Sequence, residues 1–283
     1  MTLTGAAKLA GIMGWPVAHS RSPALHGHWL AEHGIDGAYV PMAVKPENLR
    51  RAVQTLPLLG FAGCNLTIPH KEEAMRIIDE YDPAARRAGS INTIILRADG
   101  RILGSSTDGY GFLAALRAAL PAFSAAAGPA VVLGAGGAAR AIAAVLLDDG
   151  APEIRLVNRT PERAAKLAKT LGGAIRGVAW EARAQALGGA SLLVNATSLG
   201  MEGQPPLDLP LDALPREAVV NDIVYVPLET ALLARARSRG NPAVDGLGML
   251  LHQAQPGFAA WFGVKPAVTP QLRAAVLATL QRK

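Results

Sequence analysis

The stretch Pro129-Ala-Val-Val-Leu-Gly-Ala-Gly-Gly-Ala-Ala-Arg140 decides the fold expected for the second half of this 283-residue chain. Residues 131–133 form a short apolar run typical of a buried strand. They lead through glycines into a helix predicted over 138–147. Glycines let a backbone approach a pyrophosphate, and a helix N-terminus offers free N–H groups. The spacing therefore predicts nucleotide binding by Gly134, Ala135, Gly136, Gly137 and Ala138; the alternative is a tight turn whose glycines serve packing alone.

Beyond this turn the sequence alternates strands and helices. Strands are predicted at 154–157, 192–194 and 218–222, and helices at 161–171 and 229–238. Thr160 is expected to cap the first of these helices, with Pro161 at its first position. Regular alternation of this kind indicates a doubly wound parallel sheet, so residues 113–246 are expected to form a Rossmann-like domain.

The first half is also predicted to be α/β, but its strands and helices do not alternate regularly. Two apolar runs flank Asp99-Gly100, a strong hairpin signal, so the sheet should contain at least one antiparallel pair and be mixed. Strands are predicted at 9–13, 39–42, 63–67, 91–96 and 101–103, and helices at 23–33, 47–56 and 71–79. Further helices predicted at 249–262 and 270–282 are expected to pack back on this half. The N-terminal domain would then be discontinuous, comprising residues 1–112 and 247–283.

Composition excludes several classes of protein. Half of the residues are hydrophobic and 18% are charged, so the chain can bury a core and is not disordered. A lone cysteine, Cys64, excludes an internal disulfide framework and fits a reducing compartment. The net charge is +6, but the basic residues are scattered, which disfavours nucleic-acid binding. Prolines and glycines interrupt the uncharged stretch 118–139, and no targeting signal is visible, so a soluble, cytoplasmic protein is expected. No metal-ligand spacing accompanies the six histidines.

The end of the second Rossmann strand indicates the cofactor. Domains that prefer NAD usually carry an acidic residue about 20 residues after the glycines, where it holds the ribose 2′-hydroxyl. Here the chain reads Asn158-Arg159-Thr160, with Arg163 one turn further on. Guanidinium groups bind phosphate oxygens in pairs, so the pattern favours the 2′-phosphate of NADP. The alternative is a solvated helix start.

Three polar motifs follow predicted strands in the first half. They are His19-Ser20-Arg21-Ser22-Pro23, Asn65-Leu-Thr67-Ile-Pro69-His-Lys71, and Gly89-Ser-Ile-Asn92-Thr93 with Ser106-Thr107-Asp108-Gly109 downstream. Strand ends are where α/β folds place ligands, and hydroxyls and amides suit a polyhydroxylated substrate. Lys71 and Asp108 are the candidate proton-transfer groups. Any one motif alone is also explained by capping and turn chemistry, such as a helix start at Ser22-Pro23.

Together these motifs resemble the shikimate dehydrogenase family over nearly the whole chain. Further matching motifs are Asn195-Ala-Thr-Ser198, Asp222-x-x-Tyr225-x-Pro227 and Asp245-Gly-Leu-Gly-Met-Leu-Leu-His-Gln253. The resemblance implies reversible NADPH-dependent reduction of 3-dehydroshikimate to shikimate, in aromatic amino-acid biosynthesis. It also implies an N-terminal substrate domain, a Rossmann-like NADP domain and an active site in the cleft between them. The assembly is expected to be a monomer or a homodimer.

The resemblance also assigns the site residues. Lys71 would be the catalytic acid/base, assisted by Asp108. Substrate would be bound by both of these and by Ser20, Ser22, Thr67, Asn92, Tyr225 and Gln253. The cofactor would contact the glycine turn and Asn158, Arg159, Thr160, Arg163, Ile223 and Gly246. The chain departs from the family at Ser106, where Asn is usual, and at Ser90, where Ala is usual. Neither change touches the Lys71–Asp108 pair.

Three rival readings stay open. A quinate/shikimate dehydrogenase that accepts NAD as well as NADP is disfavoured by two arginines with no acid alongside. A non-catalytic NADP-sensing protein is disfavoured by the intact Lys71–Asp108 pair. The Asn-Arg-Thr motif also occurs in glutamyl-tRNA reductases, but these need a catalytic cysteine. Cys64 lies among apolar residues and is expected in the core.

Overall fold

The computed structural model describes residues 3–280 and divides into two compact units. The first unit comprises the chain up to Asp108 and again from Leu251 onward, and the second comprises Gly109–Leu250. The chain passes between the units within two helices, α5 (Asp108–Ala119) and α9 (Leu247–Phe262). No helix in the described part of the chain combines the length and the apolar character needed to cross a membrane.

The first unit is built on a mixed six-stranded sheet in the order β2-β1-β3-β5-β6-β4. Strands β2, β1 and β3 run parallel, β5 is antiparallel to both β3 and β6, and β4 is parallel to β6. The hairpin predicted at Asp99-Gly100 is therefore present, between β5 and β6. The strand bounds are β1 Lys8–Gly14, β2 Gly37–Ala43, β3 Phe61–Leu66, β4 Glu80–Tyr81, β5 Thr93–Leu96 and β6 Ile102–Ser105.

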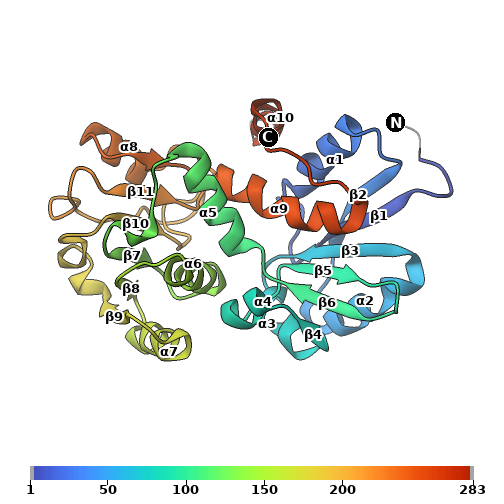
Figure 1. Ribbon diagram of the computed structural model, residues 1–283, viewed down its shortest axis with the longest axis horizontal. Helices are drawn as coiled ribbons and strands as arrows, with labels where there is room; N and C mark the ends of the chain where they lie inside the picture. The colour runs from blue at the N-terminus through green and yellow to red at the C-terminus, as the bar shows by residue number, and fades with distance from the viewer. Residues whose placement is uncertain (1–2, 281–283) are drawn as a thin grey trace. The chain divides into compact units, whose positions relative to one another are not determined.

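Helices from both ends of the chain pack against this sheet (Figure 1). The Trp261 indole N–H, on α9, donates to the Ile94 carbonyl of β5 at 2.9 Å. The Trp29 indole N–H, on α1, donates to the Ala267 carbonyl at 2.9 Å, between α9 and α10. These bonds join the C-terminal segment to the first sheet. The helices of this unit are α1 Ser22–Glu32, α2 Leu49–Thr55, α3 His70–Glu73, α4 Pro83–Ala88 and α10 Pro270–Leu280.

The second unit is built on an entirely parallel sheet in the order β12-β11-β10-β7-β8-β9. The predicted doubly wound parallel sheet is confirmed. Its strands are β7 Ala130–Leu133, β8 Ile154–Asn158, β9 Ile175–Ala179, β10 Leu192–Asn195, β11 Val219–Asp222 and β12 Ala243–Val244. Its helices, besides α5 and the start of α9, are α6 Gly137–Asp148, α7 Pro161–Leu171 and α8 Ala231–Ser238.

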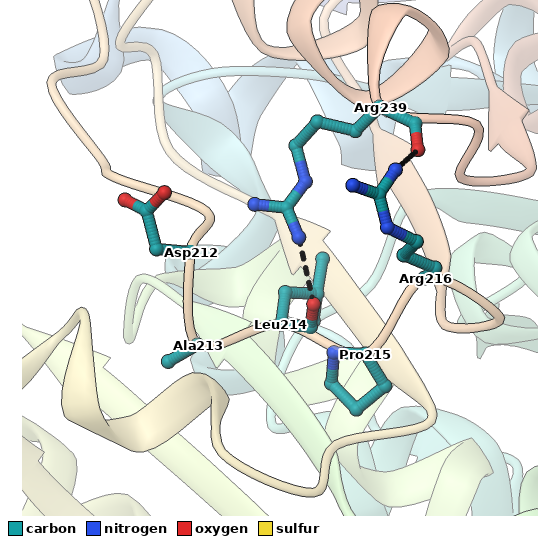
Figure 2. A pocket seen from close by; sticks show the side chains of 6 residues that line it. All are labelled: Asp212, Ala213, Leu214, Pro215, Arg216 and Arg239. Atoms are coloured by element: carbon teal, nitrogen blue, oxygen red, sulfur yellow. Dashed lines mark hydrogen bonds between the residues drawn. The ribbon is translucent and has the colours of Figure 1, made fainter.

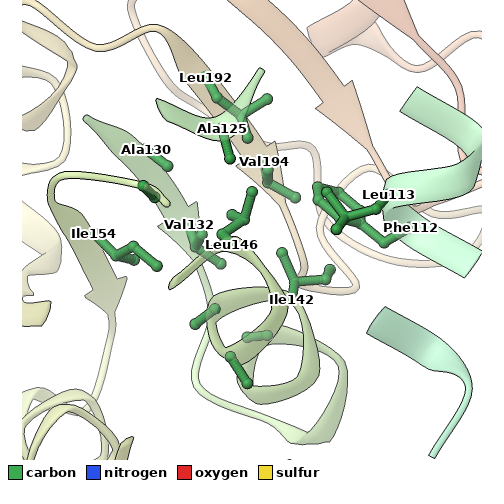
Figure 3. Packing of buried hydrophobic residues seen from close by; sticks show 14 of the residues in the cluster. Phe112, Leu113, Ala125, Ala130, Val132, Ile142, Leu146, Ile154, Leu192 and Val194 are labelled. Atoms are coloured by element: carbon green, nitrogen blue, oxygen red, sulfur yellow. The ribbon is translucent and has the colours of Figure 1, made fainter. Parts of the chain in front are cut away.

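Strand β7 is buried on both faces, which explains why it reads as a continuous apolar run. Ala130 and Val132 contribute to one core, which Ile142 and Leu146 of α6 join from the same helix face (Figure 3). Val131 and Leu133 contribute to a second core on the opposite face of the sheet. Alternate residues of one strand thus serve two cores, as expected for a parallel sheet covered on both sides.

One local prediction is wrong, one is confirmed in position only, and one is described in part. The helix predicted over 71–79 is only the single turn α3, followed by a 3-10 turn at Ala74–Arg76 whose Ala74 carbonyl accepts from both Ile77 and Ile78. Thr160 stands at the N-cap of α7, but its side chain makes no capping hydrogen bond. The helix predicted over 270–282 is described as far as Leu280, and its last two predicted residues lie outside the described part of the chain.

Candidate active site

Lys71 and Asp108 form an ion pair in the first unit. Lys71 lies on α3, just after β3, and Asp108 is the first residue of α5. The Lys71 Nζ is 2.7 Å from the Asp108 Oδ2. The Asp108 side chain is 2% exposed, whereas that of Lys71 is 24% exposed. A solvent-accessible ammonium held by a buried carboxylate can exchange a proton with a bound molecule without losing its orientation.

Asn92 fixes the other oxygen of the Asp108 carboxylate. Its Nδ2 donates to the Asp108 Oδ1 at 2.7 Å and to the Thr107 Oγ1 at 3.0 Å. Its Oδ1 accepts from the Thr107 backbone N–H at 2.9 Å. The Thr107 hydroxyl in turn donates to the Gln253 carbonyl at 2.8 Å. Because hydrogen bonds to an ionised carboxylate are the stronger kind, this arrangement holds Asp108 in one orientation.

The remaining first-unit residues predicted to bind substrate are partly accessible. The Ser20 Oγ accepts from the Ser22 backbone N–H at 3.3 Å, at the start of α1. Thr67 directly follows β3, and its backbone N–H donates to the Met13 carbonyl at 2.9 Å. The Gln253 carbonyl is engaged by Thr107. Ser20, Ser22, Thr67 and the Gln253 side chain are all half-buried, so their polar groups can meet a ligand.

In the second unit, the glycine turn lies between β7 and α6. Gly134 has φ +110°, and a Cβ there would lie 2.9 Å from the Ala196 carbonyl oxygen, so the position requires glycine. Gly136 is the N-cap of α6, and no side chain caps the helix. The amides of its first turn are therefore left for another acceptor, as a dinucleotide-binding turn requires.

Arg159 and Arg163 follow β8, the strand that lies next to β7 in the sheet. Arg159 follows β8, Arg163 lies in the first turn of α7, and both side chains are exposed. Neither makes an ion pair or a side-chain hydrogen bond with any residue from 3 to 280, whereas Arg155 is fully engaged by Glu153 and the Ala186 carbonyl. Nearby, the Asn158 Nδ2 donates to the Thr160 carbonyl at 2.9 Å. Two unpartnered guanidinium groups suit a doubly charged phosphate.

The Asp222 carboxylate is not among the predicted site residues, yet it organises the ends of strands β10 and β11. It accepts from the Asn195 Nδ2 at 2.9 Å, the Val224 backbone N–H at 3.0 Å and the Thr230 hydroxyl at 2.8 Å. Burial raises the pKa of Asp222. The only signal for this role in the sequence is its place in the Asp222-x-x-Tyr225 motif. Its contacts tie β10, β11 and α8 together.

Ile223, Gly246 and Tyr225 belong to the same end of the sheet. A Cβ on Gly246 would lie 2.2 Å from the Ile223 carbonyl oxygen, so glycine there permits the backbone of the two segments to touch. Tyr225 and Ile223 are half-buried. The structure thus brings Ile223 and Gly246 together, and close packing of their backbones explains the glycine.

A pocket in the second unit contains none of the predicted site residues. It has a volume of about 510 Å³ and is lined by Asp212, Ala213, Leu214, Pro215, Arg216 and Arg239. Figure 2 shows that each arginine uses its guanidinium to bind a backbone carbonyl: Arg239 donates to Leu214 at 2.9 Å, and Arg216 donates to Arg239. These bonds join the 212–216 loop to the end of α8 and explain both arginines structurally.

A Rossmann-like sheet with a glycine turn, together with a lysine–aspartate pair in the mixed-sheet unit, fits the class of NADP-dependent oxidoreductases. Family models identify which one. A model described as the shikimate dehydrogenase substrate binding domain matches residues 12–94, and one described as shikimate / quinate 5-dehydrogenase matches residues 118–200. The chain belongs to the shikimate dehydrogenase family.

Individual relatives agree. The chain is 61% identical to the shikimate dehydrogenase (NADP(+)) of Paramagnetospirillum magneticum, over 97% of this chain and 100% of that one. A shikimate 5-dehydrogenase from Thermus thermophilus, solved with NADP(H) and shikimate, is 38% identical, with a TM-score of 0.84 over 96% and 99% of the two chains. A quinate dehydrogenase from Corynebacterium glutamicum, solved with NAD, is 29% identical, with a TM-score of 0.89 over 96% and 99%.

Proposed function

We propose that this chain catalyses the reversible, NADPH-dependent reduction of 3-dehydroshikimate to shikimate. The observation that carries the proposal is the Lys71–Asp108 ion pair, with its ammonium accessible and its carboxylate buried. NADPH, when bound, supplies the hydride that reaches the ring carbonyl carbon. Negative charge then develops on the carbonyl oxygen, and the Lys71 ammonium donates the proton that this oxygen needs. In the oxidative direction Lys71 accepts that proton, and Asp108 holds the lysine in place.

Substrate binding is proposed for the polar residues around this pair. Ser20 and Ser22 would bind the substrate carboxylate through hydroxyl groups, which add no charge near Lys71. Thr67, Asn92, Asp108 and Gln253 would bind ring hydroxyls, and Tyr225 is proposed as a further substrate residue. The first unit would thus serve as the substrate domain and the second as the NADP domain, with domain bounds of 1–112 with 247–283 and of 113–246.

The second unit suits NADP in three respects. The Gly134–Ala138 turn allows close approach, and the uncapped start of α6 offers backbone donors to the pyrophosphate. Arg159 and Arg163 are exposed and unpartnered among residues 3–280, so they can bind a 2′-phosphate without first breaking protein contacts. Asn158, Thr160, Ile223 and Gly246 are proposed to line the same cofactor. A cytoplasmic location, and a monomeric or homodimeric state, complete the proposal.

The direct test is an initial-rate comparison of shikimate and quinate, each with NADP and with NAD, followed by the absorbance of the reduced nicotinamide. The proposal predicts that shikimate with NADP is the best pair by kcat/KM. Comparable rates with quinate and NAD would instead identify a quinate/shikimate dehydrogenase that accepts NAD as well as NADP. NADP binding without turnover on either substrate would identify a non-catalytic sensor.

A further inference from the structure

A chain of hydrogen bonds runs from the buried edge of the first sheet to the Asp108 carboxylate. The Tyr39 hydroxyl on β2 lies 2.6 Å from the Asn65 Oδ1 on β3. The Asn65 Nδ2 donates to the Asn92 carbonyl at 3.0 Å and to the Thr93 Oγ1 at 3.1 Å. The Thr93 hydroxyl donates to the Asn92 Oδ1 at 3.0 Å, and the Asn92 Nδ2 reaches Asp108.

Backbone groups fix the direction of every bond in this chain. The Asn92 carbonyl can only accept, so the Asn65 Nδ2 must face it and the Asn65 Oδ1 must face Tyr39. The Thr107 backbone N–H can only donate, so the Asn92 Oδ1 must face it and the Nδ2 must face Asp108. Tyr39 is therefore a donor, and every N–H and O–H along the chain points toward the carboxylate.

The far end of the chain is held in a buried aromatic cluster. The Tyr39 ring is 7% exposed and stacks on the His26 imidazole at a centroid distance of 3.9 Å and an interplanar angle of 6°. Burial raises the pKa of Tyr39, so the hydroxyl stays protonated and remains a donor at all working pH values. The Tyr39 hydroxyl donates to Asn65 at 2.6 Å, and it also interacts with the Ser22 side chain.

From this geometry we propose that Tyr39 and Asn65 are positioning residues that act through Thr93 and Asn92 to orient the Asp108 carboxylate on Lys71. The inference rests on the proposed function, because its readout is that reaction. Aligned hydrogen bonds strengthen one another, so a donor several bonds away adds to the hold on a buried carboxylate. Tyr39 is thus assigned to turnover, although it touches neither substrate nor cofactor.

Tyr39→Phe is the sharpest test, because it removes one hydroxyl and keeps the ring that stacks on His26. We expect kcat with shikimate and NADP to fall about 2- to 10-fold, the range for one neutral hydrogen bond, with KM for shikimate nearly unchanged. The pH–rate profile should move as well, because the Lys71–Asp108 pair is then held less firmly. Lys71 is the one charged side chain in the described residues that contacts Asp108.

Tyr81→Phe is the matched control, since Tyr81 lies in the same unit on β4 and its ring contacts Arg86 outside the chain of bonds. It should leave kcat and the pH profile at wild-type values. A second test uses Asn65→Ala: if Tyr39 acts through Asn65, the double variant Tyr39→Phe/Asn65→Ala should be no slower than Asn65→Ala alone.

Three results would overturn the inference: Tyr39→Phe with wild-type kcat, a fall in kcat with an unmoved pH–rate profile, or losses that multiply in the double variant. If Asn65→Ala does not fold, Tyr39→Phe and its control still decide the question. Wild-type protein without activity on shikimate and NADP would instead overturn the proposed function.

Discussion

His26 makes the stability of the first unit depend on pH in a way that one substitution should abolish. Its imidazole is fully buried, and neither ring nitrogen has a hydrogen-bond partner among residues 3–280. It packs against the rings of Tyr39, Trp29, Phe258 and Trp261. Burial lowers the pKa of His26 from its usual 6.5 to about 3. The folded protein thus holds this histidine neutral, whereas the unfolded chain protonates it below pH 6.5.

The sign and size of the effect follow from these two pKa values. His26 contributes no penalty above pH 6.5, and below it the unfolded state binds a proton that the folded state does not. Stability therefore falls by about 1.4 kcal/mol per pH unit until pH approaches 3, and by about 2–3 kcal/mol in total between pH 7.5 and 4.5. For a unit of this size that is roughly 5–10 °C in Tm.

His26→Phe removes the titrating group, keeps an aromatic ring and gives up only a weak interaction with the Asn65 side chain. Its unfolding, followed in urea by tryptophan fluorescence at pH 7.5 and 4.5, should lack this increment. Between pH 7.5 and 4.5 the free energy of unfolding of the variant, relative to that of the wild type, should therefore rise by about 2–3 kcal/mol. His28→Gln, a change at a half-buried histidine two residues away, should follow the wild type. Parallel pH curves for His26→Phe and wild type would refute this account of the buried imidazole.

The remaining predictions concern catalysis and cofactor choice. Lys71→Ala should lower kcat about 10²–10⁴-fold in steady-state assays with little change in shikimate binding by calorimetry; near wild-type turnover would remove Lys71 from the mechanism. Asp108→Asn should lower kcat and shift the pH–rate profile, and a change in KM alone would make Asp108 a binding group only. Replacing Arg159 and Arg163 together by Ala should weaken NADP about 10²-fold or more and leave NAD nearly unchanged, as measured by cofactor titration. Equal losses for both cofactors would count against the 2′-phosphate assignment.

The regular part of the fold could be predicted because one principle dominates it. Strands such as β7 and β10 are buried on both faces, so they are apolar except for Asn195 at the end of β10, and the pattern is visible in the sequence. Strand β9 was not predicted, because it is a sheet edge with Arg176 and Gly177 exposed, and its hydrophobic pattern is weak. Helix α5 was missed because glycines interrupt its first turns, while packing of Phe112 and Leu116 in the core compensates.

The candidate site also has a part that the sequence predicts and a part that it does not. Motifs predict which residue types gather at strand ends, and the ion pair between Lys71 and Asp108 agrees with that expectation. The residues that hold the pair in place were not predicted. Tyr39 and Asn65 lie 26 positions apart and meet only because β2 and β3 flank β1 in the sheet. Strand order is a tertiary property, so no local pattern in the sequence contains this contact.

The two-segment composition of the first unit has a consequence for synthesis on the ribosome. Trp29 and His26 are covered by Phe258 and by the Ala267 carbonyl, which lie beyond the whole of the second unit in the chain. At about 5–20 residues per second, the ribosome needs roughly 10–30 s after Asp108 to reach them. During this time the apolar residues of the nascent N-terminal segment stay uncovered. The contiguous second unit can complete its core first. Residues after Leu251 therefore complete a unit whose first part, up to Asp108, is synthesised much earlier.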